Sequence, residues 1–67
     1  MKFEEFELNH TYQYNGDKLW KYTVIELSDK RVKFLAQNNH GVETVCGPYS
    51  AKDPILNPFR RRFAKVV

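Results

Sequence analysis

Short runs of alternating apolar and polar residues, separated by turn-forming residues, fill most of this chain. β-branched and aromatic residues concentrate in four such runs, at 10–14, 19–27, 31–37 and 42–46. A period of two indicates β-strands with one buried face. In the third run, Val32, Phe34 and Ala36 predict the core face. Arg31 and Lys33 alternate with them and predict a solvated basic face, so antiparallel β-structure is expected.

The second run, 19–27, is the longest and has apolar residues on both of its faces. Strict alternation places Trp20 and Val24 on one face. It places Ile25 and Leu27 on the other. This distribution predicts a central, bent strand that contributes to the core twice.

Turn-forming residues separate these runs. Asn15 and Gly16 lie between the first two runs, and this pair readily adopts the positive φ angles of a two-residue hairpin turn. Further turns are expected at 28–30 and 38–41, and the Gly-Pro pair at 47–48 is expected to end the fourth strand. Successive strands are therefore predicted to form hairpins.

The two ends of the chain are less regular. Residues 1–8 fit either a short helical turn or a packed extended arm. Residues 49–58 contain two prolines, which lack the amide donor of a central strand, so a loop or a single helical turn is expected. A fifth strand is expected within 59–67, with 63–67 as its better part, and a helix over 59–64 is the alternative.

Four or five short strands without a crossover helix favour one all-β domain over residues 1–67, either a small antiparallel five-stranded barrel or a strongly bent sheet. The order of strands and turns over 8–67 resembles the SH3-like small barrels of the Tudor and KOW type. Some members of that group hold methylated side chains in an aromatic cage, and others bind nucleic acid or polymerase through their loops. The resemblance concerns architecture alone, since no family motif matches. A split barrel or a dimer that shares a sheet is the alternative.

The net charge of +3 conceals an uneven distribution. Residues 1–29 carry three basic and six acidic side chains, whereas residues 30–67 carry eight basic and two acidic ones. Such asymmetry predicts a basic surface for an anionic partner. Internal pairing between the two halves, together with solubility, is the alternative.

Three consecutive arginines near the end of the sequence are the sharpest basic feature. Guanidinium groups grip phosphates bidentately, so nucleic acid or an acidic protein surface is expected to bind here. If Phe59 and Phe63 are exposed, they stack on bases; if they are buried, the arginines form only a charged sheet edge. The predicted contact residues are Lys33, Arg60, Arg61, Arg62 and Lys65.

Aromatic residues on both sides of the Asn-Gly pair form a second candidate surface. Cross-strand pairing brings such residues together, and exposed rings near Asp17 and Glu26 would hold a cation or a methylated lysine. The alternative is that the rings cover the core of a small domain. The residues concerned are Tyr12, Tyr14, Trp20 and Tyr22.

The residues needed for catalysis or metal binding are sparse. The single cysteine, Cys46, forms no internal disulfide and is expected to be a buried structural residue. His10 and His40 lack the short spacings of metal sites, and the glycines form no phosphate-cradling loop. No metal, cofactor, catalytic residue or small-molecule substrate is therefore predicted.

The sequence also predicts the location of the protein, its class of function and its binding partners. It has no secretory signal and no run approaching the ~20 apolar residues of a membrane span, so a cytoplasmic protein without membrane contact is expected. Together, the features predict a non-enzymatic binding module that engages nucleic acid through a basic C-terminal surface. The alternative is a protein–protein interaction module, or a small regulatory or inhibitor protein of the phage-type accessory kind, that docks on an acidic partner. A homodimer is a further possibility.

Overall fold

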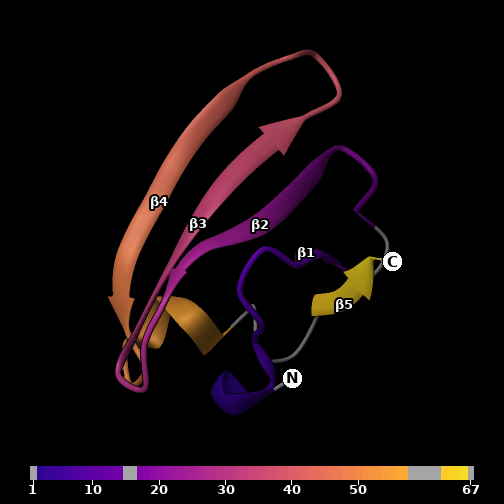
Figure 1. Cartoon of the computed structure of the whole chain (residues 1–67). Helices are drawn as coiled ribbons and strands as arrows, with labels where there is room; N and C mark the ends of the chain where they lie inside the picture. The colour runs from indigo at the N-terminus through magenta and orange to yellow at the C-terminus, as the bar shows by residue number, and fades with distance from the viewer. Residues whose placement is uncertain (1, 15–16, 58–62, 67) are drawn as a thin grey trace.

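The computed structural model describes residues 2–14, 17–57 and 63–66, and for residue 14 and residues 63–66 it describes the backbone. The described residues form two short 3-10 turns and the strands of one sheet (Figure 1). The elements in chain order are η1 Phe3–Glu5, β1 Thr11–Tyr14, β2 Trp20–Leu27, β3 Arg31–Asn38, β4 Glu43–Ser50, η2 Pro54–Leu56 and β5 Phe63–Val66.

The strands form an antiparallel sheet with the order β4-β3-β2-β1-β5. Strands β1 to β4 pair successively along the chain, and β5 returns to pair with the second edge of β1. The all-β, antiparallel prediction is confirmed. In the described part of the chain β4 and β5 are the outer strands and do not pair with each other, so this sheet is open rather than a closed barrel. Figure 1 shows β2, β3 and β4 curving together, with β1 and β5 to one side.

The first hairpin is wider than the Asn-Gly pair predicts. Tyr12 pairs with Tyr22, and this register leaves 15–19 as the connection, where a tight turn would use two residues. The Asp17 carboxylate accepts a hydrogen bond from the Leu19 amide at 2.8 Å, which orders the second half of the connection. The hairpin is therefore confirmed and its length corrected, while positions 15 and 16 themselves lie outside the described residues.

A β-bulge in β2 changes which side chains reach the core. The pairing of β2 with β3 shifts between Val24 and Glu26, so Ile25 is an extra residue and Glu26 lies opposite Lys33. The extra residue inverts the alternation beyond it. Leu27 consequently packs against the core that contains Val24, and the prediction that Leu27 shares a face with Ile25 is wrong.

A second bulge lies directly across β3, in β4. Two residues, Gly47 and Pro48, oppose Lys33 alone. Gly47 has a φ angle of +103°, and a Cβ atom there would lie 3.0 Å from the Val32 carbonyl oxygen and 3.0 Å from the Tyr49 nitrogen. The freedom of glycine thus lets β4 bulge and continue, so the prediction that this pair ends the strand is wrong.

The core lies on one face of the sheet. Phe6 packs edge-on against Tyr12 and Phe34, with ring centroids 5.3 and 5.4 Å apart. The core face predicted for the third run is confirmed, because its three apolar residues at 32, 34 and 36 are all buried. The buried cluster consists of Phe6, Tyr12, Val24, Val32, Phe34 and Leu56.

The segments outside the sheet are fixed to this core by side chains. The Tyr12 hydroxyl accepts a hydrogen bond from the Glu7 amide at 2.9 Å, just after η1. At the start of η2, the Asp53 carboxylate caps the turn by accepting from the Ile55 amide at 3.0 Å, and Leu56 is fully buried. The helical turns considered for both segments are therefore confirmed. Among the described helices, none has the length and apolarity to cross a membrane.

Candidate nucleic-acid interface

Lys33 is the predicted basic contact whose side chain the structure describes. It leaves β3 between the two bulges and is 29% exposed. The arginines at 60–62 lie outside the described residues, as does most of the helix considered for 59–64. For Lys65 the backbone is described, and it lies opposite Tyr12 in the pairing of β1 with β5.

The predicted aromatic surface is divided between the core and its border. Tyr12 is 0% exposed because its ring packs against Phe6, so it is a core residue and does not belong to an exposed contact surface. Trp20 and Tyr22 are half-buried, and the side chain of Tyr14 lies outside the described residues. The predicted cross-strand pairing is found between Tyr12 and Tyr22.

Tyr22 lies where the core meets solvent. Its ring packs edge-on against Phe34, with centroids 6.4 Å apart. Burial raises the pKa of the Tyr22 phenol above its ordinary value of 10.0, and the nearby Asp17 carboxylate, Cys46 thiol and Tyr49 phenol raise this pKa further. The phenol is therefore neutral at physiological pH. It offers a ring and a hydroxyl, not a charge, to a partner.

Glu26 does not contribute to an aromatic cage with Tyr22. In the bulged part of β2 it lies opposite Lys33, and the Lys33 Nζ and Glu26 Oε2 atoms are 3.7 Å apart. Of the two acidic neighbours predicted for the aromatic cluster, Asp17 is thus the one found near Tyr22.

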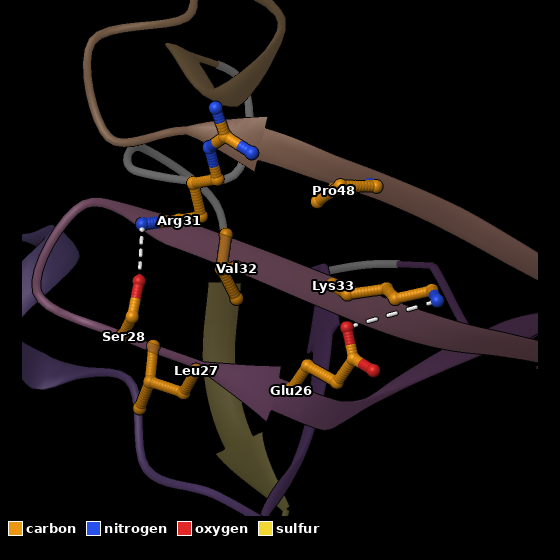
Figure 2. Close-up of a pocket in the computed structure, with 7 residues that line it drawn as sticks. All are labelled: Glu26, Leu27, Ser28, Arg31, Val32, Lys33 and Pro48. Carbon is orange, nitrogen blue, oxygen red and sulfur yellow. Dashed lines mark hydrogen bonds and ion pairs between the residues drawn. The ribbon is translucent and has the colours of Figure 1, made fainter.

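A pocket of about 240 Å³ lies beside the two bulges. It is lined by residues of three neighbouring strands and of the turn between β2 and β3 (Figure 2). Arg31 and Lys33 flank the buried Val32 in β3, so alternation directs both of them away from the core. This bulge pocket is lined by Glu26, Leu27, Ser28, Arg31, Val32, Lys33 and Pro48.

The polar groups of the bulge pocket are mainly donors. Ser28 Oγ accepts hydrogen bonds from the Lys30 amide at 3.3 Å and the Arg31 amide at 3.1 Å, which leaves its hydroxyl proton free to donate. The Arg31 guanidinium has no hydrogen-bond or ion-pair partner among the described residues. Lys33 has the long contact to Glu26, whose side chain is 67% exposed. The pocket therefore presents two cations and one hydroxyl against one carboxylate.

Sequence reasoning found Lys33 but missed the rest of this pocket. The period of two predicts Arg31 on the basic face of β3, yet nothing in that period brings Pro48 and Ser28 beside it. The available signal was the Gly-Pro pair at 47–48 within an otherwise strand-like run, because an isolated glycine in a strand often marks a bulge.

The outer edge of β4 is a second exposed feature. In the described chain β4 pairs with β3 alone. Val42, just before the strand, is 49% exposed, and Val45 within it is 53% exposed. Apolar side chains therefore lie next to unpaired backbone groups.

The remaining chemistry-bearing residues are scattered. Cys46 is half-buried in β4, and His10 Nε2 lies 3.1 Å from a carboxylate oxygen of Glu7. Within the described residues, no three His, Cys, Asp or Glu side chains gather in a way that would hold a metal ion. Comparison with known proteins finds no match for this chain among family models, curated proteins or solved structures.

Proposed function

We propose that this chain is a non-enzymatic binding module that engages nucleic acid through basic side chains near its C-terminal end, together with Lys33. The observation that carries the proposal is where the positive charge lies. The chain has eleven basic and eight acidic side chains. Without the four basic side chains at 60–62 and 65, seven basic remain against eight acidic, a net charge of −1. All of the surplus positive charge therefore belongs to the segment around β5.

The position of β5 supports this proposal. β5 is an outer strand, and its first residue, Phe63, lies opposite Tyr14. The three arginines directly precede Phe63 in the sequence, so they belong to the segment that leads into this outer strand. Arginine binds phosphate bidentately, and such contacts release counterions, so affinity should fall steeply with salt.

The architecture and location are part of the same proposal. An open antiparallel sheet is compatible with the strand order of SH3-like barrels of the Tudor and KOW type, some of which bind nucleic acid. A cytoplasmic setting keeps thiols reduced, in agreement with a chain that has one cysteine.

The test is fluorescence anisotropy with labelled single-stranded and double-stranded oligonucleotides at roughly 50 and 200 mM salt. One variant changes Arg60, Arg61 and Arg62 to glutamine. The matched control changes the exposed lysines at 18, 21 and 30 to glutamine, which removes the same charge from other parts of the surface.

We expect tight binding at low salt that the arginine variant loses by about a thousandfold, since each of the three lost charged contacts costs about 1.5 kcal/mol or more. The lysine variant should lose much less. Equal losses in both variants would show that only net charge matters. Absence of binding at the lower salt concentration would overturn the proposal.

A protein partner is the second candidate, and the edge of β4 favours it. An extended segment of another chain can add to an exposed strand through main-chain hydrogen bonds, while apolar side chains such as Val45 supply specificity. A second copy of this chain is the first partner to test, by light scattering over a range of concentrations. Val45→Lys should abolish any association, because charged side chains on an edge strand oppose pairing.

A further inference from the structure

We propose that the bulge pocket is a receptor for a terminal phosphate of the nucleic-acid strand, an inference that rests on the proposed function. The pocket is a place where the regular sheet is interrupted on both sides of one residue. Both neighbours of β3 bulge opposite Lys33, and the shifted strands bring Glu26 and Pro48 to either side of it. Bulges are frequent beside functional sites because they redirect side chains.

The donor set matches a phosphate monoester. A terminal phosphate carries close to two negative charges at neutral pH and offers three acceptor oxygens. The pocket offers the Arg31 guanidinium, the Lys33 ammonium and the Ser28 hydroxyl. Figure 2 shows Arg31 and Lys33 leaving β3 on either side of Val32, with Ser28 hydrogen-bonded to the Arg31 amide. A diester has two free oxygens and one negative charge, so it fits this set less completely.

The size of the pocket limits what it takes. Its volume of about 240 Å³ is below the ~300–1,000 Å³ usual for drug-sized ligands, so a phosphate with part of its sugar fits and a whole cofactor does not. Pro48 adds an apolar wall beside the donors.

Glu26 is the one group that opposes an anion. Its contact with Lys33 is long, at 3.7 Å, and its side chain is 67% exposed. Exposed ion pairs contribute only about 0–1 kcal/mol to stability, so a bound phosphate can form an ion pair with Lys33 in place of Glu26, whose side chain then points to solvent.

The pocket and the β1–β5 edge of the sheet would contact different parts of one nucleic-acid strand. The pocket lies at the Leu27 end of β2, whereas the β1–β5 pairing begins near the Trp20 end. At about 3.3 Å per residue, these ends are roughly 23 Å apart. The oligonucleotides used to test the inference must be long enough to span this separation.

The first experiment follows amide chemical shifts of the isotopically labelled wild-type chain during titration with inorganic phosphate, with chloride holding the ionic strength constant. We expect shifts concentrated at the amides of Ser28, Arg31 and Lys33. Arg31→Gln should weaken phosphate binding by about tenfold or more. Lys30→Gln is the matched control, since Lys30 lies in the same turn and carries the same charge but does not line the pocket.

The second experiment compares the anisotropy of 5′-phosphorylated and 5′-hydroxyl oligonucleotides of one sequence. The inference predicts tighter binding of the phosphorylated strand, and Arg31→Gln should remove that preference. Equal affinity for the two strands would overturn it, as would shifts spread evenly over all basic residues in the phosphate titration. The wild-type titration needs no variant, so a variant that does not fold cannot hide either result.

The two experiments also separate this inference from the function on which it rests. Localised phosphate shifts without any oligonucleotide binding would overturn the proposed function and leave a site for free phosphate. Oligonucleotide binding that depends on the arginine run, without shifts at the pocket, would overturn the inference alone.

Discussion

Gly47 lies where the β4 backbone passes close to Val32. A Cβ atom there would meet two backbone atoms at 3.0 Å, and its φ angle of +103° is unfavourable for any L side chain. Gly41 also has a positive φ angle, of +82°, but a Cβ atom there would have no other atom within 4 Å. An alanine at position 41 therefore measures the conformational cost of a side chain without a steric clash. Gly47→Ala should lower the free energy of unfolding by about 2–4 kcal/mol and Gly41→Ala by about 1 kcal/mol, measured by urea denaturation. Equal effects would mean that the bulge relaxes to admit a side chain.

Tyr22 makes stability depend on alkaline pH. Burial first, then Asp17, Cys46 and Tyr49, raise the pKa of its phenol above 10.0. The folded chain therefore holds the phenolic proton more tightly than the unfolded chain does. The resulting stabilisation is complete below about pH 10 and is lost as the pH rises through the raised pKa.

Urea denaturation at a series of pH values from about 8 to about 11 tests this dependence. The free energy of unfolding of Tyr22→Phe should decrease less with rising pH than that of the wild type. Part of the decrease should persist, because burial also raises the pKa of Tyr49. Parallel pH profiles for the two proteins would contradict the expectation.

At the scale of elements, the Tyr12 hydroxyl connects the segment after η1 to β1. Tyr12 Oη accepts from the Glu7 amide at 2.9 Å and makes a longer, 3.5 Å contact to the Glu5 carbonyl. Tyr12→Phe should cost about 1–2 kcal/mol and speed hydrogen exchange at the Glu7 amide. The Asn9 amide, bonded to the Val24 carbonyl at 2.8 Å, is the internal reference, and uniform acceleration of both amides would point to global destabilisation instead.

The alternation of apolar and polar residues correctly predicts the regular strands, but it fails where a β-bulge inserts an extra residue into a strand. The faces of β3 follow directly from its period of two, as do the hairpins from the turn residues between strands. The bulges at Ile25 and at 47–48 lie outside that rule, because one extra residue moves every later side chain to the other face. Of the candidate site, Lys33 was accessible to sequence reasoning, whereas its neighbours Ser28 and Pro48 depend on the bulges.

For the whole molecule, the charge distribution predicts how binding responds to salt. Replacing Arg60, Arg61 and Arg62 with glutamine removes three positive charges and leaves a net charge of zero. On single-stranded nucleic acid, each phosphate contact contributes about 0.7 to the slope of log affinity against log salt concentration. The slope should therefore become shallower by about 2 in the variant. An unchanged slope with weaker binding would indicate that the arginines act through the fold and not through phosphate.

The return of β5 to β1 has a consequence for the order in which the chain folds. The β2–β3 and β3–β4 hairpins close over 28–30 and 39–42, whereas β1 and β5 come together only after 15–62 have been enclosed. The longer closure costs roughly 2 kcal/mol more in chain entropy. The central hairpins should therefore form early and the β1–β5 pairing late, as slow nonlocal contacts do. Pulsed hydrogen exchange during refolding should find the amides of β3 protected before those of β5.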